Sequence, residues 1–203
     1  MNKRSPKREA IIEAAQALFL EHGYGVTSMD MVAGKAGVSK ATIYAHFAGK
    51  DDLFAAVIHR HRELDFDSMP PWERQPDAGT ALTQAGTDLI RLILSPDVMG
   101  MHRVVVAEAP RQPELARAFW EAGPAYGKAR VVALFADLDR RGLLSVPEAW
   151  AAADQFLGML RSEVFYRTLL GLALPEGRSP QTTVANAVDT MLRAYAPRKA
   201  CAG

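Results

Sequence analysis

The sequence predicts an all-α protein, and three observations support this fold class. Apolar residues recur every three or four positions along most of the 203 residues, whereas the alternation of apolar and polar residues that marks a strand is scarce. Proline stands where several candidate helices begin, a position that it favours. Hydrophobic residues make up 49% of the chain and charged residues 23%, a balance typical of a folded protein rather than a disordered one.

The first two expected helices lie near the N-terminus. Residues 7–22 form the first, and Gly23 ends it. Its apolar face consists of Ile11, Ala14, Ala15, Leu18 and Phe19. Thr27 and Asp30 then form the Thr-x-x-acid arrangement that caps a helix start, and Gly37 ends this short second helix.

A tight turn leads from the second helix to the third. Gly37 can adopt the left-handed conformation, Val38 fills the angle between the helices, and Ser39 caps the third helix. The apolar side chains of Ile43 and Phe47 would face the core. This arrangement predicts a helix-turn-helix that holds its third helix outward.

The outward residues of the third helix are of types that suit a DNA groove. Lysine reaches phosphate or guanine, hydroxyl groups reach phosphates or base edges, and alanine fits against a thymine methyl group. Lys50, at the start of a fourth helix, would meet phosphate. The expected DNA contacts are Thr27, Ser39, Lys40, Ala41, Thr42, Tyr44, His46 and Lys50. The alternative is that this stretch is only a three-helix packing unit.

Prolines at positions 70, 71 and 76 predict a break between two domains, residues 1–68 and 77–197. In the second domain, apolar side chains indicate one long helix and a final helix. They are Trp150, Phe156, Leu157, Leu160, Val164, Leu169 and Leu170 on the long helix, and Val184, Ala187, Val188, Met191, Leu192 and Tyr195 on the final one. These two faces would form either a dimer interface, the interpretation we favour, or the core of a single chain.

Charge and motifs narrow the functional classes. Residues 1–50 hold seven Lys and Arg against four Asp and Glu, so that this segment carries +3 and the remainder −2. The single cysteine, Cys201, excludes an intramolecular disulfide and a cysteine metal cluster. The chain has no signal-peptide core, no apolar run near the roughly 20 residues that span a bilayer, and no catalytic motif. We expect a cytoplasmic protein that is not an enzyme and uses no cofactor or metal.

The N-terminal module resembles that of the TetR family of bacterial regulators. The family pattern is matched by Val38, Ser39, Thr42, Ile43, Tyr44, Phe47, Lys50 and Leu53, and upstream by Ile11, Ala14, Ala15, Phe19, Gly23 and Thr27. Ala48-Gly49 departs from it, because polar residues are common there. Residues 104–124, VVVAEAPRQPELARAFWEAGP, resemble the AefR-like subgroup of C-terminal domains.

The resemblance implies a homodimer that binds a palindromic operator in double-stranded DNA, and a C-terminal helical domain for dimerisation and effector binding. The implied function is a repressor released by a small molecule. An effector pocket between helices would be lined by Met101, His102, Val105, Phe119, Trp120, Met159, Arg161 and Phe165. Glu108 is an alternative polar anchor to Arg161.

Three other functions stay open at this point. The chain would be an effector-independent regulator or activator of the same fold, a helical enzyme, or an adaptor that uses the module to dock a protein. Because DNA binding depends on salt, salt sensitivity separates a regulator from an adaptor.

Overall fold

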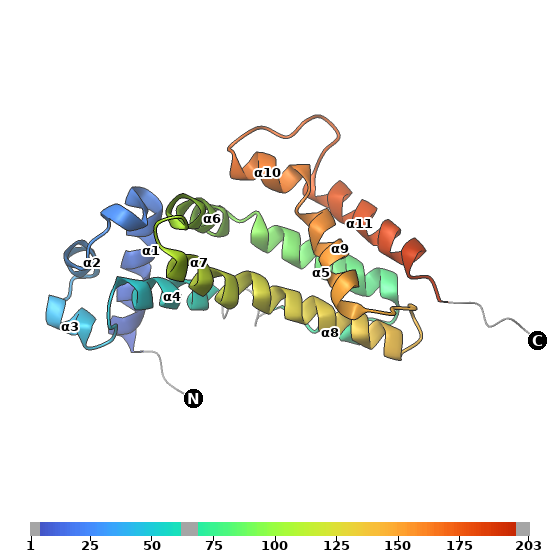
Figure 1. The fold of residues 1–203 in the computed structure, drawn as a ribbon, viewed down its shortest axis with the longest axis horizontal. Coiled ribbons are helices and arrows are strands. Elements are labelled where there is room, and N and C mark those ends of the chain that lie inside the picture. Colours follow the sequence, from blue (N-terminus) through green and yellow to red (C-terminus); the bar gives the residue numbers. More distant parts are fainter. Residues whose placement is uncertain (1–4, 62–68, 198–203) are drawn as a thin grey trace, which may run out of the picture. The chain divides into compact units, whose positions relative to one another are not determined.

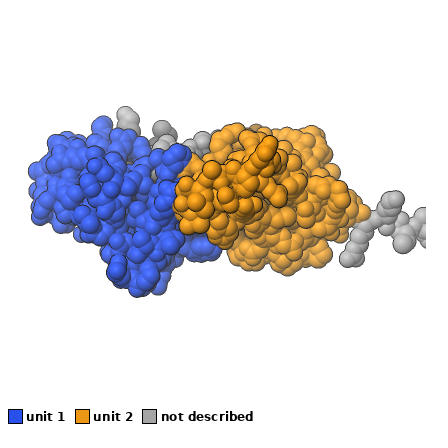
Figure 2. Space-filling view, turned by 90° about the horizontal axis from the view of Figure 1, so that it is seen from above, with its two compact units in different colours: residues 1–68, 96–125 blue, residues 69–95, 126–203 orange. Residues whose placement is uncertain are grey.

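The computed structural model describes residues 5–61 and 69–197, and every regular element in these two ranges is a helix (Figure 1). This confirms the predicted all-α class. Cys201 and the predicted domain end at residue 68 lie outside the described residues. Among the described helices, none has the length and apolar character needed to cross a membrane. The chain divides into two compact units, residues 1–68 with 96–125 and residues 69–95 with 126–203 (Figure 2).

The first unit contains the predicted helix-turn-helix. Its elements are α1 (Pro6–Val26), α2 (Met29–Ala36), α3 (Lys40–Tyr44), α4 (Lys50–His61), α6 (Pro96–Glu108), α7 (Pro113–Trp120) and a π-helical turn, η3 (Glu121–Ala125). Helix α1 packs against α2, α4 and α6, and α7 packs against α4 and α6. Gly23 interrupts α1 with a positive φ of 80°. The predicted helix end at this glycine therefore corresponds to a break in the helical conformation.

One hydrophobic core joins the helix-turn-helix to α6 and α7. Met101 and Val105 of α6 and Leu115 of α7 belong to the same buried cluster as Ile11 of α1 and Phe54 of α4. Residues 96–125 are distant in sequence from this module, yet they pack within its unit. The predicted domains, residues 1–68 and 77–197, are continuous in sequence and place residues 96–125 in the second domain. Sequence order does not reveal that these residues pack with the first unit.

The second unit is also built of helices. They are η2, a 3₁₀ turn (Trp72–Arg74), α5 (Ala78–Ile93), α8 (Tyr126–Arg140), α9 (Ala149–Leu160), α10 (Glu163–Leu169) and α11 (Pro180–Ala194). Helix α5 packs against α11, and α9 packs against both α8 and α11. At Gly86 of α5, a Cβ atom would lie 2.9 Å from Val184 and 3.2 Å from Phe156. A side chain at this position would therefore require Val184 and Phe156 to shift.

The long helix predicted around residues 150–170 is wrong. Arg161 has φ −88° and ψ 37°, outside the helical region, and α9 ends there. Ser162 is then the N-cap residue of a separate helix, α10. The spacing of apolar residues continues through this break, so the sequence pattern alone did not reveal the end of α9.

The predicted interface faces are mostly part of the core of the second unit. Seven of their residues are buried within a single chain: Phe156, Leu160, Val164, Val184, Ala187, Val188 and Met191. Helix α11 uses this face to pack against α5 and α9. The favoured assignment of these seven side chains to a dimer interface is therefore wrong, because their own chain already covers them.

The segment after the proline pair is anchored in the second unit. Trp72 is fully buried, and its indole N–H donates to Asp88 Oδ2 at 3.0 Å. The Gln84 amide donates to both carboxylate oxygens of Asp88, at 3.0 and 2.9 Å, and the Arg130 guanidinium lies 4.3 Å from the Trp72 ring centroid. These contacts satisfy a carboxylate that would otherwise be buried at high cost.

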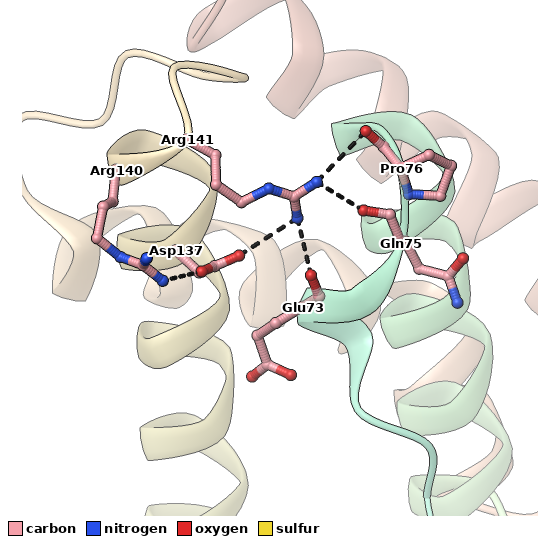
Figure 3. A network of polar contacts seen from close by, with 6 residues as sticks. All are labelled: Glu73, Gln75, Pro76, Asp137, Arg140 and Arg141. Carbon is pink, nitrogen blue, oxygen red and sulfur yellow. Dashed lines mark hydrogen bonds and ion pairs between the residues drawn. The ribbon is translucent and has the colours of Figure 1, made fainter.

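Arg141 holds the connection between η2 and α5 (Figure 3). Its guanidinium donates to the backbone oxygens of Glu73 and Gln75, both at 2.8 Å, and of Pro76 at 3.3 Å. It also pairs with Asp137 at 3.3 Å. The neighbouring Arg140 also pairs with Asp137 (Figure 3), and its side chain is exposed. One planar guanidinium therefore attaches an irregular segment to the end of α8.

We expect Arg141→Lys to lower the free energy of unfolding by about 1–3 kcal/mol, because an ammonium cannot reproduce the forked hydrogen bonds to three carbonyls. Arg140→Lys is the matched control and should change it by less than about 0.5 kcal/mol, because the Arg140 side chain is exposed and lysine keeps its charge. Chemical denaturation followed by circular dichroism measures both. Equal effects of the two substitutions would contradict a special role for Arg141.

Candidate DNA-binding site

The turn between α2 and α3 forms through local hydrogen bonds. Ser28 caps α2, and its hydroxyl oxygen accepts from the Met31 N–H at 3.2 Å. Gly37 ends α2 in the left-handed conformation, with φ 66° and ψ 31°. Ser39 caps α3 and accepts from the Thr42 N–H at 3.1 Å. The predicted roles of Gly37 and Ser39 are thus confirmed.

The predictions made for Thr27 are wrong. Ser28, the next residue, is the N-cap of α2. Thr27 is only 1% exposed, and its hydroxyl donates to the Gly23 backbone oxygen at 2.8 Å, with the Leu18 oxygen 3.2 Å away. The Thr27 side chain thus points inward to backbone oxygens of α1. Its side chain is therefore not available to DNA.

Helix α3 has one buried face and one open face. Ile43 and, just beyond the helix, Phe47 are buried in the core of the first unit, as predicted. The Tyr44 side chain is 50% exposed. The other candidate contacts of the open face are the exposed Ser39, Lys40, Ala41 and His46 and the half-buried Thr42. A short helix held by its apolar side and open on its polar side has the geometry needed to enter a groove.

Lys40 is engaged by a carboxylate of the neighbouring helix. Its ammonium lies 2.8 Å from Oδ1 and 3.0 Å from Oδ2 of Asp30, which is in the first turn of α2. Both side chains are more than half exposed. The hydrogen bond and charge of Asp30 raise the pKa of Lys40, with a smaller contribution from Tyr44. Lys40 therefore stays charged at the surface of the helix-turn-helix.

Lys50 lies in a different environment from the one predicted. Its ammonium donates to the backbone oxygens of Tyr24 at 2.8 Å and Thr27 at 3.0 Å, with Gly25 at 3.4 Å, and it lies 4.3 Å from the Tyr24 ring centroid. Burial lowers the pKa of Lys50. The predicted phosphate contact does not fit these contacts, because the ammonium donates to carbonyls at the end of α1 that lack helical partners.

The aromatic ring of Tyr24 completes this junction. It stacks on Phe19 with ring centroids 5.4 Å apart and meets the edge of Phe54 at 5.5 Å. Its hydroxyl donates to the carboxylate of Asp51, at the start of α4. Burial and this hydrogen bond raise the pKa of Tyr24. The end of α1 and the start of α4 are thus joined by both Lys50 and Tyr24.

Polar contacts also fix the other end of α4 to α1. The Arg60 guanidinium donates to carboxylates of Glu9 and Glu13 and to the amide oxygen of Gln16 at 3.3 Å. Arg60 is largely buried, so its pairs are shielded from solvent more than surface pairs are. Helix α4 therefore supports the module from both ends.

The predicted effector residues divide between the two units. Met101, His102, Val105, Phe119 and Trp120 are in the first unit, and Met159, Arg161 and Phe165 are in the second. In the first unit, Met101 and Val105 are buried core, and the His102 and Phe119 rings meet edge to face at 4.8 Å. In the second, Phe165 is buried, and burial lowers the pKa of the half-buried Arg161. A single pocket lined by both groups stays a prediction.

Sequence reasoning missed two contributors to the site. Ser28 stands directly before the first helical residue, a signal for an N-cap, but the Thr27–Asp30 spacing favoured its neighbour. The Arg8 guanidinium lies 5.1 Å from the Phe47 ring centroid and covers the base of α3. No local sequence signal could have revealed a contact between residues so far apart.

The contacts of Lys50 predict a loss of stability on substitution rather than a loss of a phosphate contact. Lys50→Met should lower the free energy of unfolding by about 1–3 kcal/mol, because it removes the donor from part-buried carbonyls. Lys35→Met, at an exposed position in the last turn of α2, is the control and should have a much smaller effect. If instead Lys50→Met kept stability and reduced the salt slope of DNA binding by about 1, Lys50 would be a phosphate contact after all.

Comparison with known proteins identifies both halves of the chain. Residues 11–57 match the family described as "Bacterial regulatory proteins, tetR family", and residues 80–197 match "AefR-like transcriptional repressor, C-terminal domain". A TetR-family transcriptional regulator from Mesorhizobium loti is 28% identical, with a TM-score of 0.83 over 96% of this chain and 99% of that chain. The "Flavonoid-responsive Regulator FrrA" is 31% identical, with a TM-score of 0.79 over 95% of this chain and 98% of that chain.

Two curated relatives align with short segments of the chain. The chain is 41% identical over 58 residues to the transcriptional activator FasR of Mycolicibacterium smegmatis, and 44% identical over 55 residues to the transcriptional repressor BepR of Brucella suis. These alignments cover 29% and 27% of this chain and 26% of each relative, so the chain spans about a quarter of their length. The matches over both domains confirm the resemblance read from the sequence, and the chain belongs to the TetR family of DNA-binding transcriptional regulators, with an AefR-like C-terminal domain.

Proposed function

We propose that this regulator is a repressor that binds a palindromic operator as a homodimer and is released by a small-molecule effector. The observation that carries the DNA-binding part is the open face of α3, where Lys40 and Tyr44 are exposed while Ile43 holds the helix to the core. The match of residues 80–197 to an AefR-like repressor domain favours repression. FasR, an activator, keeps activation as the alternative.

In this proposal each protomer places α3 in a major groove. Lys40 and Tyr44 then meet phosphates or base edges, and the two half-sites lie about 34 Å apart, or one helical turn. A dimer with twofold symmetry requires a palindromic site for this reason. The protein would work in the cytoplasm, where it covers a promoter and blocks transcription.

Exposed apolar side chains support dimerisation through the second unit. Trp150 of α9, Tyr166 of α10, and Leu170 and Leu172 after α10 are each more than half exposed in the single chain. Large exposed apolar side chains are enriched at protein interfaces. These residues replace the buried face of α11 as the proposed dimer contact.

Arg161 supports an effector with an anionic group. Its side chain is half-buried, and within the described ranges its guanidinium has no hydrogen-bond or ion-pair partner. A partly desolvated guanidinium gains most from a carboxylate or phenolate that it can bind bidentately. A flavonoid carries phenolic groups, and a similar structure is named as flavonoid-responsive. A flavonoid or an aryl carboxylate is therefore the first effector class to test.

The DNA-binding proposal is tested by selecting bound duplexes from a random pool with the purified protein. We expect a palindromic site, and Lys40→Ala and Tyr44→Ala should each weaken binding to it by roughly 1–3 kcal/mol. Arg193→Ala, an exposed arginine of α11, is the control and should leave affinity unchanged. Binding that enriches no site and does not respond to salt would favour the adaptor function instead.

The effector proposal is tested by titrating flavonoids and aryl carboxylates into the complex with the selected DNA. An effector must bind one conformational state better than the other, so the expected result is dissociation of DNA and not only binding of the compound. Arg161→Ala should raise the required concentration of an anionic compound at least about tenfold, as for loss of a hydrogen bond to a charged group. If no compound weakens the DNA complex, the protein is an effector-independent regulator.

A further inference from the structure

An acidic residue lies beside the candidate DNA-contacting lysine. Asp30 is exposed on α2, and both of its carboxylate oxygens are within 3.0 Å of the Lys40 ammonium. The two residues belong to different helices of the helix-turn-helix, so the pair is formed by the turn at Gly37 and not by helical spacing. A surface that binds a polyanion thus carries a negative charge next to one of its cations.

Support of α2 alone does not explain this pair. An acidic side chain in the first turn of a helix is favourable, and Asp30 provides that. However, the start of α2 already has its cap in Ser28, and the Asp30 carboxylate is directed to Lys40. An exposed ion pair between two helices also contributes little to stability. The position of this carboxylate is therefore better explained by its effect on Lys40.

We propose that Asp30 is a positioning residue that makes Lys40 select a base over a phosphate and so increases the sequence specificity of DNA binding. This inference rests on the proposed DNA contact of Lys40. Phosphate contacts are independent of sequence, whereas base contacts carry sequence information. A residue that weakens the first kind and permits the second raises the ratio of specific to nonspecific affinity.

The chemistry of the two acceptors explains the selection. A phosphate is an anion, so to reach Lys40 it must displace the Asp30 carboxylate or be held next to it against charge repulsion. The O6 and N7 atoms of guanine are neutral acceptors in the major groove. An ammonium has three donors, so Lys40 can donate to guanine while it still donates to Asp30. The carboxylate therefore penalises a phosphate more than a guanine edge.

The test compares affinity for the selected operator with affinity for a scrambled duplex of the same length and composition. Asp30→Asn should strengthen binding to the scrambled duplex by roughly two- to fivefold more than binding to the operator, the scale expected of one exposed ion pair. The ratio of the two affinities then falls by that factor. Asp30→Glu keeps the charge within reach of Lys40 and should keep the ratio.

Two controls separate a local effect from a change in net charge. Glu21→Gln removes one exposed carboxylate from α1 that pairs with His22, whereas Lys40 pairs with Asp30. It should alter both affinities equally and leave their ratio unchanged. In a Lys40→Ala background, Asp30→Asn should change the ratio no more than Glu21→Gln does, because the proposed action passes through Lys40. Thermal unfolding of each variant verifies that α2 is intact.

The outcomes distinguish this inference from the proposed DNA surface. If Lys40→Ala leaves operator affinity unchanged, the proposed contact fails, and this inference fails with it. If Lys40→Ala weakens binding while Asp30→Asn behaves like Glu21→Gln, only the role of Asp30 is overturned. The role of Asp30 is also overturned if Asp30→Asn lowers the ratio of operator to scrambled affinity equally with and without Lys40. A ratio that falls only in the presence of Lys40 and is retained by Asp30→Glu supports the role of Asp30.

Discussion

The cap that Lys50 places on the end of α1 is the interaction on which the geometry of the helix-turn-helix depends. The chain breaks its helix at Gly23, and carbonyls between residues 24 and 27 then need donors. One ammonium with three donors binds them from the start of α4, so it joins the two helices that precede α2 and follow α3 in the sequence. The direction of α3 follows from this junction and from the core beneath it.

The cations of this protein have two kinds of role. Lys50, Arg60 and Arg141 hold helix ends and connections, and their hydrogen bonds go to carbonyls or to carboxylates of the same unit. Among the residues that the structure describes, Lys40 pairs with an exposed carboxylate. A count of basic residues in the N-terminal segment does not distinguish these roles, because a lysine that caps a helix and one proposed to contact DNA add the same charge to the sequence.

The shared core of the first unit physically connects α6 to α3, the helix proposed to enter the DNA groove. Met101 and Val105 of α6 pack in one buried cluster with Ile11 of α1, Phe54 of α4 and Ile43 of α3. Close-packed interiors transmit displacements, because little free volume absorbs them. A shift of α6 would therefore displace core side chains that pack against α3. In a regulator of this family, the predicted effector residues of α6 stand where such a shift can begin.

The sequence by itself determined the all-α class, the turn at Gly37, the cap at Ser39 and the inward side of α3, because each depends on local spacing, backbone conformation and nearby hydrogen bonds. Tertiary structure alone decided the roles of Thr27 and Lys50, the break at Arg161 and the burial of the α11 face. These depend on which distant carbonyl, ring or helix reaches a side chain. Apolar periodicity shows that a face is covered, but whether its own chain or a partner covers it depends on packing that periodicity does not encode.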